Sequence, residues 1–224
     1  YIPRYRTWSK KINQQIEGRD EDTYYDAIII SAPPNTHLPL LKKNINKSKV
    51  FLIEKPICEP NQKTINNFKK LIKKYKDKIF LCGYNHRLFP STILLKSILK
   101  FEKNNFNFVE VKFKENTECF LKAHSWYKSL SDSYLSSSKK GGGSLCEHSH
   151  AINLSQHIFD DNFNFKLIYK DLKFFKDKKS NYDLNSDMIF SYKNKIIKIV
   201  QNFQSKPTEK EILVSGNNFF VKLI

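Results

Sequence analysis

Short apolar runs alternate with helical segments in the first part of the chain, and this alternation restricts the possible folds more than any other feature. The runs span residues 26–31, 50–53 and 79–84 and are rich in isoleucine, leucine and phenylalanine. Continuous apolar runs of this length are typical of strands buried on both faces. Between the second and third runs, apolar residues recur at helical spacing while lysines occupy the opposite face. They are Ile65, Phe68, Leu71, Ile72 and Tyr75. Strands that alternate with helices favour right-handed β-α-β units and a parallel sheet.

Asparagine and proline mark where the helices of this part begin. Two prolines end the first apolar run, and Asn35 or Thr36 can then cap a helix over residues 36–46. Asn61 can cap the amphipathic segment in the same way. The predicted order is therefore strand, helix, strand, helix, strand.

The pattern changes near residue 88. Residues 91–101 have helical periodicity, and apolar residues then alternate with charged ones over 109–114, as in a half-exposed strand. Further strand candidates are 164–169, 187–192, 195–203 and 211–215, with tight turns at 193–194 and 216–217. We therefore predict an α/β chain with a parallel sheet in residues 1–88. An α+β domain over residues 89–224 follows, with a mostly antiparallel sheet that is open on one face.

Composition restricts the partners. The net charge of +17 comes from 39 basic and 22 acidic residues among 224, a balance that can mark nucleic-acid binding. The lysines are spread along helix faces rather than gathered in one stripe, so we expect no nucleic-acid partner.

No apolar run approaches the roughly 18–20 residues that span a bilayer, so we expect no membrane segment. Four scattered cysteines predict reduced thiols in a cytoplasmic protein. They are Cys58, Cys82, Cys119 and Cys146.

Polar segments follow each predicted strand. Glu54-Lys55-Pro56 follows the second run, at the end of a strand where open α/β sheets bind ligands. The first run leads into a Pro-Pro-Asn-Thr-His turn and a helix N-terminus, which suits a phosphate or a ribose. The third run is followed by an amide, an imidazole and a guanidinium group. These are Asn85, His86 and Arg87, and an ordinary turn between domains would explain them equally well.

A glycine triplet, residues 141–143, precedes a predicted helix. Glu147, His150, Asn153 and His157 recur on it at spacings of three and four, so they would share one face. A histidine one turn from a carboxylate can be held in one tautomer for proton transfer near neutral pH. The other interpretation is a polar helix face with incidental histidines. Because no HExxH or comparable spacing is present, we expect no metal.

In this order the four segments resemble the Gfo/Idh/MocA family, the glucose–fructose oxidoreductase and inositol dehydrogenase-like NAD(P)-dependent oxidoreductases. The resemblance covers essentially the whole chain and implies a partial Rossmann-like sheet for its first domain. Residues 145–153 look closest to a branch associated with surface-polysaccharide and amino-sugar pathways. The implied substrate is a sugar, a sugar nucleotide or a cyclitol, and the implied cofactor is NAD or NADP. The open sheet of the second domain could form a homo-oligomer.

The resemblance also implies residue roles. Lys55 would lie between nicotinamide and substrate, and His150 would be the catalytic acid or base with Glu147 as its partner. The other cofactor-lining residues would be Pro34, Asn35, His37, Glu54, Asn85 and Arg87. The substrate-binding residues would be Trp126, Tyr127, Tyr134 and Asn153. The three aromatic residues among them are explained equally well as core residues.

The chain departs from the family pattern in four ways. It has no Gly-x-Gly-x-x-Gly loop, so we expect a fragment that lacks roughly 40 residues, about one β-α-β unit, and binds a dinucleotide poorly. Its last residues, 221–224, end within a predicted strand. Glu147 stands three residues before His150, where many members have an aspartate four before, and Asn153 replaces a common aspartate. The alternative function is a non-catalytic or degenerate member that binds a sugar or a protein partner.

Overall fold

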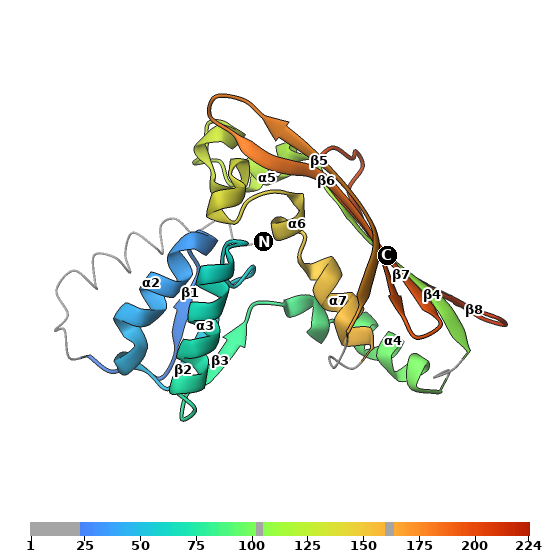
Figure 1. The fold of residues 1–224 in the computed structure, drawn as a ribbon, viewed down its shortest axis with the longest axis horizontal. Helices are drawn as coiled ribbons and strands as arrows, with labels where there is room; N and C mark the ends of the chain where they lie inside the picture. Colours follow the sequence, from blue (N-terminus) through green and yellow to red (C-terminus); the bar gives the residue numbers. More distant parts are fainter. Residues whose placement is uncertain (1–22, 102–104, 160–163) are drawn as a thin grey trace.

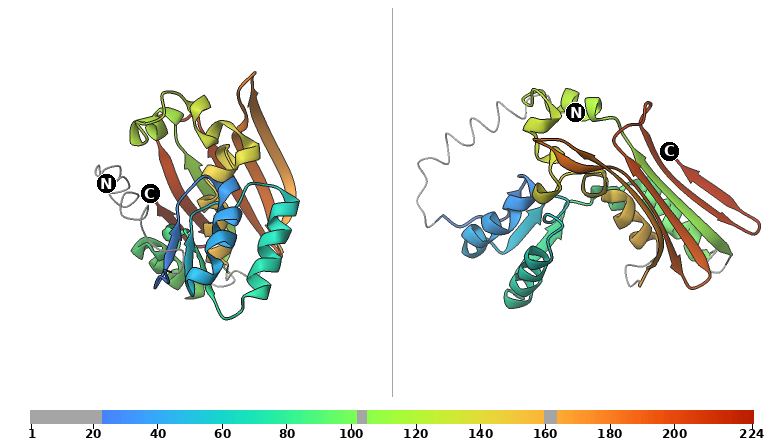
Figure 2. Two further views of the ribbon diagram at one scale, coloured as in Figure 1. Left: turned by 90° about the vertical axis from the view of Figure 1, so that its left-hand side faces the viewer. Right: turned by 45° about the horizontal axis from the view of Figure 1, so that its top comes forward.

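The computed structural model describes residues 23–101, 105–159 and 164–224. It contains two β-sheets, with helices α6 (Ser144–Glu147) and α7 (His150–Ile158) lying between them (Figures 1 and 2). The first sheet has three strands and the second has six. Within these ranges no helix is long and apolar enough to cross a membrane.

The first sheet is parallel, as predicted. Its strands are β1 (Ile28–Ile30), β2 (Val50–Ile53) and β3 (Ile79–Cys82), in the order β1-β2-β3. Helices α2 (Pro34–Asn44) and α3 (Gln62–Lys74) connect them, with the short 3-10 helix η1 (Ile45–Lys47) after α2. Because all three strands run the same way, the segments that follow them meet at one edge of the sheet.

Helices cover one face of this sheet. Phe51 and Ile53 point to that face and are fully buried against Leu41 and Phe68 of the two helices. On the opposite face Ile29 is 66% exposed and Leu81 is 51% exposed. Parallel sheets are normally covered on both faces, and no helix of the described residues covers this second face.

The two helix starts differ in how they are capped. Asn61 caps α3 as predicted, since its side-chain oxygen accepts hydrogen bonds from the amides of Lys63 and Thr64. The predicted cap of the first helix is wrong, because α2 begins at Pro34. Proline is favoured at the first helical position, where its missing N–H costs nothing. The Thr36 hydroxyl instead donates to the carbonyl of Pro33 at 2.7 Å.

The chain passes to the second sheet through η2 (Asn85–Leu88) and α4 (Pro90–Phe101). The strands are β4 (Phe106–Lys114), β5 (Lys166–Lys176), β6 (Asn181–Tyr192), β7 (Lys195–Asn202), β8 (Glu209–Gly216) and β9 (Phe220–Leu223). Their order is β5-β6-β7-β4-β8-β9, and only β4 and β7 pair in parallel. The mostly antiparallel sheet is thus confirmed. Strand β5 extends beyond its predicted end because its outer residues are exposed on both faces and give no alternating signal.

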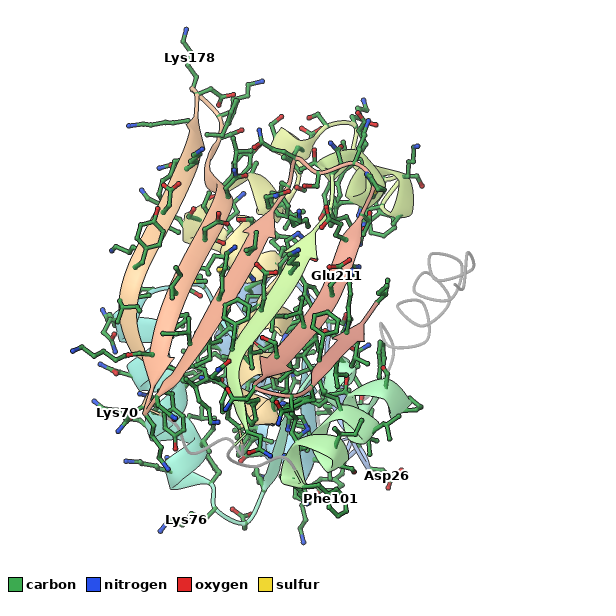
Figure 3. The ribbon with its side chains drawn as sticks, turned by 90° about the vertical axis from the view of Figure 1, so that its right-hand side faces the viewer. Asp26, Lys70, Lys76, Phe101, Lys178 and Glu211 are labelled. Atoms are coloured by element: carbon green, nitrogen blue, oxygen red, sulfur yellow. The ribbon has the colours of Figure 1, made fainter. Side chains whose placement is uncertain are left out.

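One face of the second sheet is covered and the other is open. Helices α4 and α7 pack on the first face through Leu95, Leu99 and Leu154, against a core that includes Val111 and Ile197. The other face carries charged side chains and faces the viewer in Figure 3, where Glu211 is labelled. Its ion pairs cross between strands, as in Lys198–Glu110 (2.9 Å) and Lys222–Glu211 (2.9 Å).

The prediction of a single helix after the glycines is wrong, because α6 ends at Glu147 and α7 starts at His150. Asp183 holds the start of α6, where it accepts from the Ser144 hydroxyl and the Leu145 amide, both at 2.7 Å. At the break, the side chain of Gln201 donates to the carbonyl of His148. The polar residues that the sequence placed on one stripe therefore belong to two helices.

Candidate active site

Lys55 joins the two halves of the molecule. It follows β2, and its Nζ lies 2.9 Å from Oε1 of Glu147 on α6. The same ammonium donates to the backbone carbonyl of Glu147 at 2.7 Å. The Lys55 side chain is 14% exposed and that of Glu147 22%, so the pair is mostly shielded from water. Shielding strengthens such a contact relative to a surface ion pair.

The second oxygen of Glu147 is also occupied. Its Oε2 accepts a hydrogen bond of 2.9 Å from the hydroxyl of Tyr134, which lies in the 3-10 helix η4 (Tyr134–Ser136). Burial acts to raise the pKa of Glu147, but the Lys55 ammonium and the Tyr134 hydroxyl outweigh it and hold that pKa below its usual value. Burial and the neighbouring carboxylate raise the pKa of Tyr134. In the row Lys55–Glu147–Tyr134, Glu147 is therefore a carboxylate and Tyr134 a neutral phenol at neutral pH.

The glycine triplet beside this row is approached closely by three other parts of the chain. A Cβ at Gly141 would lie 2.6 Å from the Pro34 ring at the start of α2. A Cβ at Gly142 would lie 2.3 Å from the carbonyl oxygen of Tyr134. A Cβ at Gly143, whose φ is +97°, would lie 2.0 Å from Oδ1 of Asp183. The triplet thus packs against protein atoms of the described structure and positions Tyr134 and α6.

His150 lies in an aromatic pocket beside the row. Its ring centroid is 4.4 Å from that of His86, 5.6 Å from that of Tyr84 and 6.2 Å from that of Phe113. Burial, then the Lys55 ammonium and His86, lower the pKa of His150 to about 3. Its Nδ1 is buried without a hydrogen-bond partner. The imidazole is therefore neutral at physiological pH. No described hydrogen bond joins it to Glu147, whose two carboxylate oxygens contact Lys55 and Tyr134.

Solved structures share this architecture, although no family model and no curated protein sequence matches the chain. GenD2 from gentamicin A biosynthesis, crystallised with NAD, aligns over 98% of this chain with a TM-score of 0.74 and 13% identity. An inositol dehydrogenase homologue from Azotobacter vinelandii, in complex with NAD+, aligns over 95% with a TM-score of 0.73 and 13% identity. The chain has the fold of the inositol dehydrogenase-like oxidoreductases. The α/β fold implied by the sequence resemblance is thereby confirmed.

A third structure of this inositol dehydrogenase-like fold is myo-inositol 2-dehydrogenase from Lactobacillus plantarum, with a TM-score of 0.68, 15% identity and 94% of this chain aligned. The alignments cover 62% of GenD2, 55% of the Azotobacter protein and 59% of the Lactobacillus enzyme. The chain therefore spans a little over half of the length of the proteins whose fold it shares.

The predicted cofactor-lining residues fall into two groups. Asn35 and Asn85 are exposed at the edge where the parallel strands end. His37 is fully buried, and its two ring nitrogens contact the carbonyl oxygens of Ile57 (3.1 Å) and Ala32 (2.6 Å). These contacts tie two loops together, and the cofactor-lining role of His37 stays a prediction.

The remaining predicted cofactor-lining residues contact protein atoms. Pro34 is buried beside Gly141, and Glu54 lies against Gly83. Arg87 donates from Nε to Oδ1 of Asn153 at 2.6 Å, which joins η2 to α7. Asn153 was predicted to bind substrate, and this contact already uses its side-chain oxygen.

The aromatic residues predicted for the substrate form one cluster. Trp126 is 40% exposed and packs against His124, with ring centroids 4.9 Å apart. Tyr127 stacks on Phe120, and Phe120 meets the edge of Tyr134. Neither Phe120 nor His124 was singled out from the sequence, because α5 (Thr117–Ala123), which contains Phe120 and is followed by His124, is too short to show a period. In the described ranges no three histidine, cysteine or acidic residues are grouped as metal ligands.

Acid should destabilise the protein through its buried histidines. The pKa of His148, which is 4% exposed, is lowered by burial to about 4, and that of His150 to about 3. Both values lie below the ordinary value near 6.5, so at mildly acidic pH the unfolded chain binds protons that the folded chain does not. We expect the free energy of unfolding to fall by about 2–4 kcal/mol between pH 7 and pH 5. Because the pKa of Glu147 is lowered, its contribution is lost only below about pH 4.5, outside this window.

Urea unfolding at both pH values measures this change. The variant His148→Leu should lose about half of the pH dependence, because one of the two histidines is gone. Equal stability of the wild type at the two pH values would contradict the assignment of neutral, buried rings.

Proposed function

We propose that the chain carries the catalytic part of an NAD(P)-dependent oxidoreductase that interconverts a secondary hydroxyl and a ketone of a sugar, a sugar nucleotide or a cyclitol. The observation that supports this best is the shielded Lys55–Glu147 pair of 2.9 Å at the carboxyl end of β2. Ligands of open α/β sheets bind at this edge. The proposal is also supported by the fold, which is shared with proteins crystallised with NAD or NADH.

Several features at this edge fit the nicotinamide half of NAD or NADP. The first turn of α2 has no side-chain cap, and an uncapped helix start attracts negative charge. The exposed amides of Asn35 and Asn85 can hydrogen-bond to a ribose or to a carboxamide. The 224 residues contain no Gly-x-Gly-x-x-Gly loop, so these residues are proposed to hold only the nicotinamide end.

Lys55 is the proposed proton donor and acceptor. The chemistry that a bound nicotinamide would supply is hydride transfer to or from the substrate carbon. When a ketone is reduced, the Lys55 ammonium polarises the carbonyl oxygen and gives it a proton; when an alcohol is oxidised, the amine takes that proton back. Glu147, fixed by Tyr134, holds the Lys55 ammonium in place.

His150 is proposed as the second group that handles this proton. Its ring is near enough to Lys55 for the ammonium to lower its pKa, and its neutral imidazole has one nitrogen able to accept a proton. The aromatic rings of Tyr84, His86 and Phe113 fix its position. Exposed Trp126 is proposed to stack on a sugar ring.

The test uses the protein encoded by the complete reading frame that contains these 224 residues. Reduction of NAD+ and NADP+ is followed with myo-inositol, hexoses and nucleotide sugars as substrates. We expect turnover with at least one of them. The ratio of the rates with NAD+ and NADP+ then gives the cofactor preference. A protein that binds a sugar but reduces neither cofactor with any substrate would instead support the non-catalytic alternative.

A further inference from the structure

A hollow of about 400 Å³ lies between helices α2 and α3, which are side by side on one face of the first sheet (Figures 1 and 2). A hollow of this volume can hold a small-molecule ligand. It is formed near the C-terminal ends of the two helices, which lead into the starts of β2 and β3. Lys55 follows the other end of β2. The hollow and the proposed active site therefore lie towards opposite edges of the sheet.

The polar side chains of this hollow come from both helices. On α3, Asn67, Lys70 and Lys74 recur at spacings of three and four, so they share one face of the helix. Lys42 lines the same hollow from the last turn of α2. Three lysines that are far apart or separated by other residues in the sequence are thus brought together by the packing of two helices.

The positive charge of the hollow is not balanced by acidic side chains. No carboxylate lines it, and in the part of the chain that the structure describes none of its three lysines forms an ion pair. The open face of the second sheet differs, because Lys112 and Lys198 there both pair with Glu110. Charges of one sign around a concave surface concentrate the local field. The hollow is therefore expected to attract anions.

The floor of the hollow is apolar. Ile45 and Leu71 line it and are only 6% and 9% exposed. Tyr75 also lines it, and Nζ of Lys74 lies 5.3 Å from the centroid of the Tyr75 ring. Apolar and aromatic surface beside lysines suits a ligand that combines a flat ring with negative charge.

We propose that this hollow binds a small anion that carries several adjacent phosphate groups. A chain of phosphates can contact lysines from two helices at once, whereas a single carboxylate or phosphate meets only part of this charge. The side-chain amide of Asn67 can donate a further hydrogen bond. Such a chain occurs in inorganic polyphosphate and in nucleoside triphosphates, and the apolar floor would contact the nucleoside of the latter.

Isothermal titration calorimetry of the protein from the complete reading frame measures this binding at low ionic strength, where electrostatic attraction is least screened. The probes are tripolyphosphate, ATP, inorganic phosphate and adenosine. We expect tripolyphosphate and ATP each to bind at least about tenfold more tightly than phosphate or adenosine. Tighter binding of ATP would identify a nucleoside triphosphate as the ligand, and equal or tighter binding of tripolyphosphate the inorganic chain. Phosphate that binds as tightly as tripolyphosphate, or no binding of either chain, would overturn the proposal.

A triple variant locates the binding in the hollow. It replaces all three lysines with glutamine, which keeps the helix propensity and removes the charge. The substitutions are Lys42→Gln, Lys70→Gln and Lys74→Gln. We expect the dissociation constant of tripolyphosphate to rise by about tenfold or more.

The neighbouring lysines provide a matched control. They are exposed on the same two helices and do not line the hollow, and their substitutions are Lys43→Gln, Lys69→Gln and Lys73→Gln. Both triple variants lose the same net charge, and each loses one lysine from the last turn of each helix, so effects on the helix ends are matched. Tripolyphosphate affinity should change by less than about twofold in the control. An equal loss in both variants would show attraction to net charge alone and would overturn the proposal.

Competition with dinucleotide separates this site from the proposed active site. Because the hollow lies towards the opposite edge of the sheet from Lys55, excess NAD+ or NADP+ should leave tripolyphosphate binding unchanged. Displacement by either dinucleotide would place the phosphates at the cofactor edge and overturn the proposal. A protein that reduces neither cofactor but binds tripolyphosphate through these lysines loses the oxidoreductase assignment and retains this site. A protein that oxidises sugars but shows no such binding retains the assignment and loses the site.

Discussion

Replacing Lys55 with methionine is expected to lower the turnover number of the full-length protein by about a thousandfold, with a much smaller change in KM. Methionine keeps most of the apolar stem but removes the ammonium that contacts Glu147 at 2.9 Å and is proposed to polarise the reacting oxygen. An interaction made mainly in the transition state affects kcat more than KM. Steady-state rates with the best substrate of the panel measure both constants.

Two variants control for this result. Lys112→Met removes a lysine that pairs with Glu110 and Glu211 on the open sheet face, and it should leave turnover unchanged. Glu147→Gln keeps a hydrogen-bond acceptor beside Lys55 and should reduce turnover less than Lys55→Met does. If Lys55→Met retains more than about a tenth of the wild-type rate, Lys55 is not the proton donor of the reaction.

Gly143→Ala is expected to destabilise the protein by at least about 3 kcal/mol. The backbone there has φ +97°, which disfavours any residue with a Cβ, and the new Cβ would lie 2.0 Å from Oδ1 of Asp183. Asp183 cannot move away without cost, because it also accepts from Ser144 and Leu145 at 2.7 Å. The shift of the urea midpoint at constant m-value measures the loss.

Gly83→Ala is the matched control. Its added Cβ would meet the Glu54 carboxylate at 2.7 Å, but φ at Gly83 is not positive and the end of a glutamate side chain can swing aside. A loss of about 1 kcal/mol or less is expected there. If Gly143→Ala were no more destabilising than Gly83→Ala, the close contact between Gly143 and Asp183 of β6 would be contradicted.

The position of Lys55 could be predicted because it depends on local rules. An apolar run followed by Glu54-Lys55-Pro56 places the lysine at a strand end, and parallel strands bring all such ends to one edge. The cap at Asn61 was predictable for the same reason, since a cap involves only the next turn. The partner of Lys55 was not predictable in this way, because Glu147 lies 92 residues further along the chain.

The break between α6 and α7 shows why helical spacing failed. Spacings of three and four indicate one shared face only if the helix continues. Here Gln201, 53 residues away, hydrogen-bonds to the carbonyl of His148 at the turn between the helices. The break separates Glu147 from His150, so one contacts Lys55 and the other contacts His86. No pattern within residues 141–157 signals a contact that comes from another strand.

Transfer of deuterium to the nicotinamide tests the central proposal most directly. The full-length protein is incubated with NAD+ or NADP+ and with carbon-deuterated myo-inositol, hexoses or nucleotide sugars, and the reduced cofactor is analysed by mass spectrometry. The account predicts deuterated NADH or NADPH from at least one substrate, its loss in Lys55→Met, and its retention in Lys112→Met. Deuterium transfer that persists undiminished in Lys55→Met, or none from any substrate that the protein binds, would contradict it.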